Sequence, residues 1–308
     1  MQWTVGRVKI TKIVEITSVG GSRFILPQGT SEAIQAMPWL VPHYATPEGR
    51  LRMTIQSWIV ETPSHRIVVD TCIGNGKQNR SVPIWNNLDK PYLDDLAAAG
   101  YPAESIDTVL CTHLHVDHVG WNTKLVDGRW VPTFANARYV FGKTEYEHWA
   151  AHSPEGEHRA VFEDSVKPVV DASLADLVTA DHRIGDEVSL IATPGHSPGH
   201  MSVLIRCDGA EALLTGDVAH HPCQMAHLDW SSTADSDPVQ SIETRKMLFS
   251  RFADTPTIVF GGHFDPGRLV RDGDAFRLLA CQIPTDRTAH ITGTVEFPRA
   301  VSHETSDE

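Results

Sequence analysis

The stretch VLCTHLHVDHVGW, residues 109–121, places four side chains that commonly bind metal ions within six positions. His113 and His115 are two residues apart, so in extended backbone they point the same way and could hold one ion. Asp117 and His118 are adjacent and diverge, which suits a second ion beside the first. A lone histidine is usually not a ligand, but the pattern HxHxDH is rare enough in a chain of this composition to favour a metal site.

Three more candidate ligands occur in similar surroundings later in the chain. His196 lies in a Gly/Pro-rich turn, Asp217 follows the apolar run ALLTG, and His263 follows TIVFGG. Each comes after a predicted strand and one or more small residues. Glycine permits the close backbone approach and unusual dihedral angles that a metal cage needs. The glycines concerned are Gly195, Gly216, Gly261 and Gly262.

The chemistry predicted from these donors is hydrolysis. Nitrogen and carboxylate ligands without thiolate suit zinc, although manganese, iron and cobalt accept the same donors. Two dications against two carboxylates leave surplus positive charge, which would lower the pKa of a bridging water and supply a hydroxide nucleophile. The predicted catalytic residues are Asp117, as an ionised ligand, and His220, which would assist the leaving group. The adjacent His221 is the alternative to His220.

These side chains must be positioned by an α/β fold. Short runs rich in Val and Ile, such as VKITKIVEI, HRIVVD, DTVLCT, MSVLIRC and TIVFGG, predict strands, and a late run, ITGTVEF, predicts one more. Helical patterns cover Leu88 to Ala99, Thr144 to His152 and Asp237 to Phe252, the last with Asp237 as its cap and Pro238 in its first turn. The chain shows no repeat and no linker, which favours a single domain over residues 1–308, and we expect residues 300–308 to be a disordered tail.

Composition excludes several classes of protein. A formal net charge of −13 argues against nucleic-acid binding, and two divalent ions would still leave −13 + 4 = −9. The five scattered cysteines predict reduced thiols rather than disulfides or a cysteine zinc site. No segment approaches 18 consecutive apolar residues and the N-terminal residues do not resemble a signal peptide, so we expect a cytoplasmic protein without a membrane segment.

Four motifs together resemble those of the metallo-β-lactamase superfamily: HxHxDH and the later GHSPGH, TGD and GGH. The resemblance covers roughly residues 8–285. It implies a four-layer αβ/βα sandwich of two mixed sheets with outer helices and the metals at one edge. It also implies two ions, with Asp217 bridging them and His200 supporting the site without binding metal. The first ion would be held by His113, His115 and His196, and the second by Asp117, His118 and His263.

Within this superfamily the N-terminal half resembles the branch of methyl parathion hydrolase, quorum-quenching lactonases and hydrolytic chlorothalonil dehalogenase. This resemblance implies that residues 1–50 form an extension over the site, and such an arm is compatible with a homodimer. Its aromatic side chains would form an apolar wall for a small hydrophobic substrate. The predicted wall residues are Phe24, Trp39, Tyr44 and Trp121, joined by Trp85 and Trp149.

The substrate is therefore predicted to be small and neutral. A lactone of the N-acyl homoserine type ranks ahead of an organophosphate triester, an aryl ester or a hydrolytic dehalogenation. His220 and His221 stand where small lactonases of the superfamily often carry a tyrosine, which counts against a lactone. An iron-dependent oxidoreductase and a binding protein without turnover are the two other classes; the lack of a flavin domain disfavours the first and the complete ligand set disfavours the second.

Overall fold

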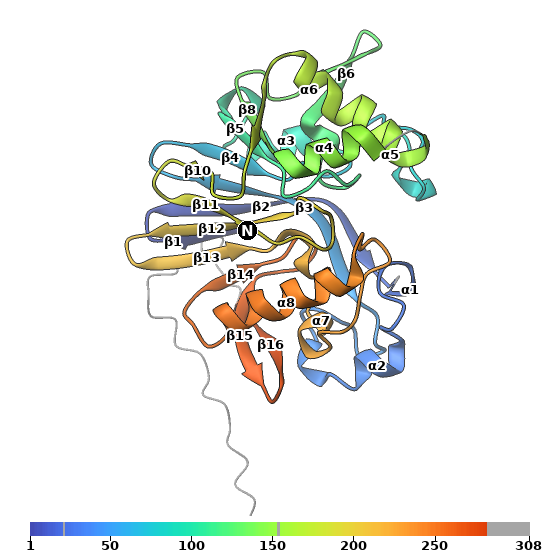
Figure 1. Cartoon of the computed structure of the whole chain (residues 1–308), viewed down its shortest axis with the longest axis vertical. Helices are drawn as coiled ribbons and strands as arrows, with labels where there is room; N and C mark the ends of the chain where they lie inside the picture. Colours follow the sequence, from blue (N-terminus) through green and yellow to red (C-terminus); the bar gives the residue numbers. More distant parts are fainter. Residues whose placement is uncertain (21, 153–154, 282–308) are drawn as a thin grey trace, which may run out of the picture.

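Two mixed β-sheets lie face to face at the centre of the computed structural model, which describes residues 1–20, 22–152 and 155–281 (Figure 1). In order across the sheet, the first consists of β1 (Gln2–Val5), β2 (Val8–Val19), β3 (Arg52–Glu61), β4 (Arg66–Val69), β5 (Thr108–Leu110), β8 (Arg138–Gly142) and β9 (Ala175–Val178). The second consists of β10 (Arg183–Ile184), β11 (Val188–Ala192), β12 (Met201–Cys207), β13 (Ala210–Leu214), β14 (Ile258–Phe260), β15 (Gly267–Asp272) and β16 (Ala275–Ala280). A separate hairpin is formed by β6 (Thr123–Val126) and β7 (Arg129–Pro132).

Helices cover the outer face of each sheet. Figure 1 shows α3 to α6 on the first sheet and α7 and α8 on the second, with α1 and α2 beside α7. The α-helices are α1 (Ser22–Ile25), α2 (Ser31–Gln35), α3 (Tyr92–Ala98), α4 (Lys143–His152), α5 (Gly156–Val161), α6 (Lys167–Asp171), α7 (Cys223–Ala226) and α8 (Pro238–Phe252). A π-helical turn, η5 (Phe162–Val166), joins α5 to α6, and short 3-10 turns are η1 (Pro38–Leu40), η2 (Pro83–Trp85), η3 (Ala103–Ser105), η4 (Gly120–Asn122) and η6 (Gly216–Val218). The predicted four-layer sandwich is confirmed.

Strand direction decides where the loops meet. In the first sheet β4, β5, β8 and β9 are parallel neighbours, and in the second β13 and β14 are. The carboxyl ends of parallel neighbours lie at the same edge of a sheet, where their loops can converge on a ligand. The loops after β5, β13 and β14 carry six of the seven predicted metal ligands, and the loop after β11 carries His196.

Three apolar clusters hold the layers together. Trp3 and Trp58 from the first sheet meet Phe260 from the second in edge-to-face contacts, with ring centroids 5.0–5.7 Å apart. A second cluster lies between the first sheet and its helices, and a third lies between the second sheet, α8 and residues 26–51. Each large apolar side chain fully buried here contributes about 1.5–3 kcal/mol.

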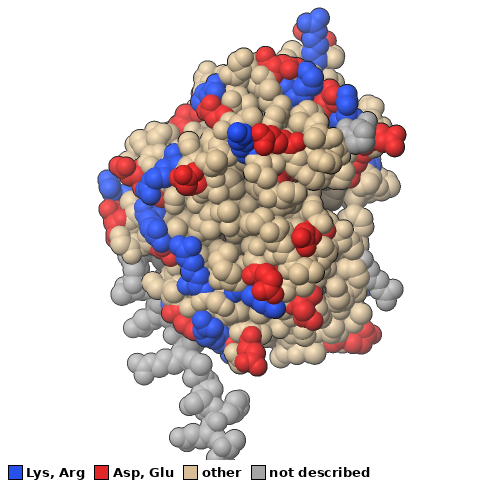
Figure 2. All heavy atoms as spheres, in the orientation of Figure 1, with Lys and Arg blue, Asp and Glu red and all other residues tan. Residues whose placement is uncertain are grey.

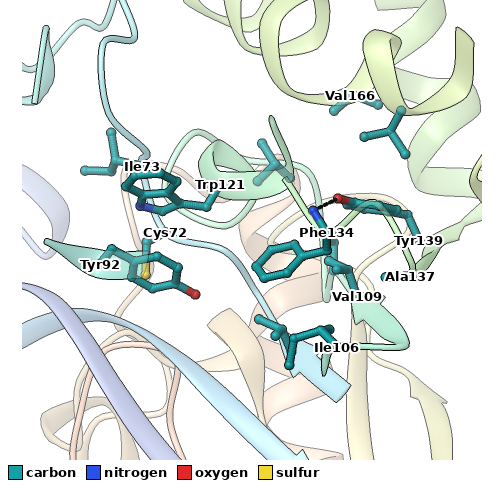
Figure 3. Close-up of a cluster of buried hydrophobic side chains, with 14 of the residues drawn as sticks. Cys72, Ile73, Tyr92, Ile106, Val109, Trp121, Phe134, Ala137, Tyr139 and Val166 are labelled. Atoms are coloured by element: carbon teal, nitrogen blue, oxygen red, sulfur yellow. Dashed lines mark hydrogen bonds between the residues drawn. The ribbon is translucent and has the colours of Figure 1, made fainter. Parts of the chain in front are cut away.

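Figure 3 shows the cluster under the helices of the first sheet, where Tyr92 stacks on Trp121 at 5.2 Å with an interplanar angle of 15°. The backbone N–H of Phe134 donates to the Tyr139 hydroxyl at 3.0 Å. Trp121 is 5% exposed and its Nε1 donates to Glu15 at 2.7 Å. It was predicted to contact substrate, but its stacking on Tyr92 makes it a core residue.

The N-terminal fifty residues do not form a single extension. β1 and β2 belong to the first sheet, and residues 26–51 pack into the cluster against α8. Of the described residues in this region, only those around α1 and at the end of β2 reach the cavity described below. The expected tail at residues 300–308 and the expected strand ITGTVEF lie outside the described residues.

Two predicted helices begin where expected and one does not. Asp237 caps α8 by accepting a hydrogen bond from the Gln240 backbone N–H at 3.0 Å, and α4 begins at Lys143. The helix predicted from Leu88 begins only at Tyr92, since Leu88 uses its carbonyl to accept the Gly76 backbone N–H at 2.9 Å.

The surface is mixed in charge. Figure 2 shows positive and negative side chains next to one another over the face in view. Exposed ion pairs, such as Arg206 with Glu211 at 2.7 Å, occur in the described chain. Within the part of the chain that the structure describes, no helix is long and apolar enough to cross a membrane.

Candidate metal centre

Four loops meet at one edge of the two sheets and bring the predicted ligands together. His113, His115, Asp117 and His118 follow β5, while the others follow β11, β13 and β14. Their ligand atoms, with those of His220, form four overlapping groups of three, and the atoms within each group lie within 4.8 Å of one another. We call His113, His115 and His196 the first ligand group, and Asp117, His118 and His263 the second ligand group. Sequence spacing pairs His113 with His115 and Asp117 with His118, and the family resemblance assigns His196 and His263 to the same two sets.

The first ligand group consists of three buried imidazoles in contact. The His115 ring lies 4.6 Å from the rings of both His113 and His196, and the Nε2 atoms of His113 and His196 are 3.1 Å apart. Burial, with repulsion from neighbouring imidazoles, holds the pKa of all three well below the usual range. These side chains are therefore neutral at pH 7 and have lone pairs free for a cation.

The second ligand group contains negative charge. Asp117 lies 3.7 Å from His118 Nε2 and 3.6 Å from His263 Nε2. Burial would lower the pKa of His118, but attraction from Asp217, Asp70 and Asp117 raises it well above the usual range. Burial would also lower the pKa of His263, but the negative charges of Asp217 and Asp117 outweigh this effect and raise it to about 9. Without a metal, protons on His118 and His263 therefore balance the negative charge of the carboxylates.

Asp217 lies between the two groups. Its Oδ2 is 3.1 Å from His263 Nε2 and 3.3 Å from His118 Nε2, and it is also 3.6 Å from His196 Nε2. Burial would raise the pKa of Asp217, but His263, His118 and His220 hold it well below the usual range. Of the two carboxylates among the seven, this ionised one lies within 4 Å of histidines from both groups.

Hydrogen bonds on the far side of the rings fix which nitrogen faces inward. His196 Nδ1 donates to Asp235 at 2.9 Å, His118 Nδ1 to Asp70 at 2.9 Å, and His263 Nδ1 to the Thr54 carbonyl at 3.0 Å. His113 Nδ1 donates to Thr112 Oγ1 at 3.1 Å, whose own proton goes to Asp70. An imidazole that donates from Nδ1 keeps its lone pair on Nε2. Once His118 and His263 release their extra protons, four Nε2 lone pairs converge.

This arrangement fits cations. The Nε2 atoms of His113 and His196 face each other with their lone pairs, and the pairing of His263 Nε2 with Asp217 requires a proton or a metal ion between the nitrogen and the carboxylate. His118 Nε2 and Asp217 Oδ1 are buried without a hydrogen-bond partner. Orphaned buried polar atoms are costly unless a proton or a metal ion satisfies them. Two cations held by the two ligand groups, with Asp217 shared, would satisfy all of them.

Glycine is required where the loops touch. A Cβ on Gly262 would lie 2.4 Å from Asp217 Oδ1, and one on Gly216, whose φ is +54°, would lie 2.6 Å from His200 Nε2. His200 accepts the Asp217 backbone N–H through Nε2 at 2.9 Å, and burial lowers its pKa to about 4. As predicted, His200 supports the ligand Asp217 and does not bind metal itself.

Of the two adjacent histidines, only His220 faces the site. Its Nε2 lies 3.2 Å from Asp217 Oδ2, and neither ring nitrogen has a hydrogen-bond partner. His221 instead donates from Nε2 to the Tyr44 carbonyl at 2.8 Å, and its Nδ1 accepts the Cys223 backbone N–H at 3.1 Å. His221 is therefore structural.

A cavity of about 650 Å³ opens onto these ligands. Phe24, Trp85 and Trp149 line it as predicted. Trp39 and Tyr44 do not, because both pack into the apolar cluster against α8, where Tyr44 is 1% exposed. The wall comes instead from aliphatic residues that sequence reasoning did not select: Ile16, Ile25, Met53, Ile55, Val82, Pro83, Ile84 and Val116.

Sequence reasoning also missed three buried carboxylates that support the ligands. Asp70 follows β4 and accepts hydrogen bonds from His118 Nδ1 and from the Thr112 backbone and hydroxyl. Asp235 accepts a hydrogen bond from His196 Nδ1. Glu145 accepts the backbone N–H groups of Leu114, in HxHxDH, and of Gly199, in GHSPGH. Asp70 alone had a sequence signal, since it ends the strand IVVD as the ligands end theirs.

Comparison with known proteins agrees with this geometry. The family model for the metallo-beta-lactamase superfamily matches residues 52–263. An N-acyl homoserine lactonase of Bacillus thuringiensis is 26% identical over 231 residues, which are 71% of this chain and 84% of that protein.

Two solved structures share the fold. AidC, a dizinc quorum-quenching lactonase, superposes with a TM-score of 0.74 at 19% identity, and hydrolase AbOPH of the beta lactamase superfamily with 0.73 at 22% identity. Each comparison covers 92% of this chain and 97% of the other. Because the family model spans the strands and loops that carry all seven ligands, this chain belongs to the metallo-β-lactamase superfamily, and it is a metal-dependent hydrolase.

Proposed function

We propose that this enzyme uses two zinc ions to hydrolyse small neutral hydrophobic lactones of the N-acyl homoserine class. The observation that carries the proposal is the cavity over the ligands. Its volume of about 650 Å³ lies within the range of sites for small organic molecules. Its walls combine aliphatic side chains with Phe24, Trp85 and Trp149.

Charge in the cavity supports a neutral substrate. Among the described residues that line it there is no Lys or Arg, while Asp117, Asp217 and Glu157 are acidic. A carboxylate or phosphate on the distant part of a substrate would have no positive side chain to pair with. An apolar acyl chain would instead gain about 25 cal/mol for each Å² removed from water.

The chain's residues divide the work. The first ligand group would hold one ion, the second ligand group the other, and Asp217 both. Zinc, when bound, supplies Lewis acidity that lowers the pKa of a water molecule and polarises the substrate carbonyl. The aliphatic wall excludes bulk water from the acyl chain and orients the ring ester toward the ligands.

His220 is placed to assist the leaving group. It lies on the loop after β13, lines the cavity, and has no hydrogen-bond partner that would occupy its ring nitrogens. When the ring ester opens, the bond between the carbonyl carbon and the ring oxygen breaks, and that oxygen must gain a proton. We assign this proton transfer to His220, so that water plus lactone yields an N-acyl hydroxy acid.

The named relatives support the lactone over the alternatives. The Bacillus thuringiensis relative and AidC are both lactonases by name. A neutral phosphotriester, an aryl ester or an aryl halide would fit the same apolar walls, so the cavity by itself does not separate them from a lactone. Metal analysis and an oxygen-uptake assay would test the iron-dependent oxidoreductase, the remaining class.

The test is a substrate panel on zinc-loaded protein of measured metal content. We expect acyl homoserine lactones to be hydrolysed, with KM falling from four-carbon to ten-carbon acyl chains, and little turnover of phosphomonoesters. His220→Gln should lower kcat more than it raises KM. A phosphotriester or a charged ester that is preferred over every lactone by a wide margin would reject the lactone assignment while leaving the metal centre intact.

A further inference from the structure

Glu145 is a buried carboxylate in the first turn of α4, directly after β8, and it is 1% exposed. Its Oε1 accepts the Leu114 backbone N–H at 3.0 Å and the Trp149 indole N–H at 2.6 Å. Its Oε2 accepts the Ser197 hydroxyl at 2.7 Å and the Gly199 backbone N–H at 2.9 Å. Four donors therefore converge on a single carboxylate.

The donors belong to the two loops that carry the first ligand group. Leu114 lies between His113 and His115, and Ser197 follows His196 directly. The loops are about eighty residues apart in sequence, and both of them hydrogen-bond to the same side chain. A change in the position of Glu145 must therefore change the distance between these imidazoles.

The loop around Gly199 has no space to adjust on its own. A Cβ on Gly199 would lie 2.2 Å from the Glu145 backbone nitrogen and 2.7 Å from its Cβ. Among the described residues no Lys or Arg forms an ion pair with Glu145, so its charge is stabilised by neutral N–H and O–H donors. A carboxylate supplies enough acceptor sites for all four, whereas an amide does not.

The same carboxylate orients a cavity wall. Trp149, which donates to Oε1, contacts the His115 ring at 5.3 Å and stacks on His158 at 4.5 Å. The distance between the two loops and the position of the wall beside His115 thus depend on one residue.

We propose that Glu145 is the positioning residue of the first ligand group. It sets the separation of His113, His115 and His196, and thereby the affinity of that group for its ion, without touching the ion. The proposal rests on the two-ion loading of the proposed function but not on its substrate. An affinity measurement tests it independently of turnover.

The experiment isolates the first site. In His263→Ala protein, which lacks one ligand of the second group, zinc affinity is measured by competition with a chromophoric chelator. Glu145→Gln is then added; it preserves size, but its NH₂ group faces the donors of one loop. We expect the zinc Kd to rise about 10–100-fold, the effect typical of partners that orient ligands. The d–d absorption of the cobalt form should change with it.

The chain offers a matched control in Glu15. This carboxylate is 8% exposed and accepts the Ile73 and Gly74 backbone N–H groups and the Trp121 indole N–H. Trp121 lies at the end of the segment after β5, and Glu15 accepts no hydrogen bond from residues 113–115 or 196–199. Glu15→Gln should lower Tm comparably and leave the zinc Kd and cobalt spectrum of the His263→Ala protein nearly unchanged.

Other outcomes remain decisive. If Glu145→Gln lowers Tm as Glu15→Gln does but keeps the zinc Kd and cobalt spectrum, Glu145 is only structural and the proposal is wrong. If Glu145→Gln does not fold, Ser197→Ala, which removes one donor and keeps the carboxylate, should weaken zinc binding by a smaller factor, and an unchanged Kd would overturn the proposal. Wild-type protein that binds fewer than two ions would instead refute the two-ion loading.

Discussion

The two halves of the metal centre differ in charge although their ligands lie within a few ångströms of each other. The first ligand group consists of neutral imidazoles whose pKa values are lowered by burial. The second contains a carboxylate and two histidines whose pKa values are raised by Asp217 and its neighbours. The first group is therefore ready for a cation at neutral pH, whereas the second must first release protons.

The supporting residues differ in the same way. Glu145 holds the first group by hydrogen bonds to the two loops that carry it, and Asp235 by a hydrogen bond from His196 Nδ1. The second is held by Asp70 and by the Thr54 carbonyl on β3. Asp70 also binds Thr112, which supports His113, so it is the supporting side chain that reaches into both halves.

The largest effect should come from the shared ligand. Asp217→Ala removes the carboxylate next to both groups, so we expect metal content to fall at both sites and kcat/KM to drop on the order of 1,000-fold. His263→Ala should retain close to one ion per chain. Equal metal loss in the two variants, measured by atomic emission after identical loading, would contradict the division into two groups.

A pH titration tests the electrostatic difference directly. Before metal binds, His263 has a pKa of about 9, so its proton competes with metal at pH 7 and is half lost at pH 9. Affinity of the second site should therefore rise about 50-fold from pH 7 to pH 9. The metal affinity of the first site should not change over this range, because its histidines are already neutral. If metal affinity changed with pH in the same way at both sites, the proposed difference in protonation between the two groups would be wrong.

Supporting carboxylates should give smaller, selective effects. Asp235→Asn keeps the shape of the side chain but weakens the acceptor for His196 Nδ1, so we expect about a 10-fold loss of affinity at the first site only. Asp70→Asn should weaken both sites, because its carboxylate serves His118 and Thr112. Titration of each variant with zinc against a chelator checks this pattern, which fails if Asp70→Asn spares the first site.

The smallest effect concerns the substrate. Phe24 is 61% exposed at the cavity, so Phe24→Ala should raise KM for long-chain lactones roughly fivefold, by losing about 1 kcal/mol of apolar contact. Trp39→Ala is the control, since Trp39 packs in the core beside α8. It should lower stability by about 2 kcal/mol and leave chain-length preference unchanged. A change of preference in Trp39→Ala alone would contradict the observed wall.

Local sequence was sufficient for the ligands and for the fold class. A strand, one or more small residues and a ligand recur at Asp217 and His263, and HxHxDH concentrates four donors in one loop. Such patterns are readable because the chemistry of a ligand and the backbone freedom beside it are both properties of neighbouring residues. The α/β class predicted on this basis is confirmed, and so is the four-layer sandwich, which the family resemblance implies.

Local sequence failed for the cavity wall and the supports. Trp39, Tyr44 and Trp121 were selected because they are aromatic, yet an aromatic side chain packs equally well in a core. Glu145 and Asp235 resemble ordinary acidic residues in the sequence, because their partners on the ligand loops lie 31 to 54 and 39 positions away. Helix α3 begins at Tyr92, since Leu88 is held in a loop by Gly76.

The sequence by itself thus determined which side chains can bind cations and which strands end beside them. Only the tertiary structure decided which histidines are neutral, which nitrogen of each faces inward, and that His220 rather than His221 is free. The physical reason is that protonation and ring orientation depend on burial and on charges brought within a few ångströms by the meeting of two sheets. Those distances exist only after the loops have converged.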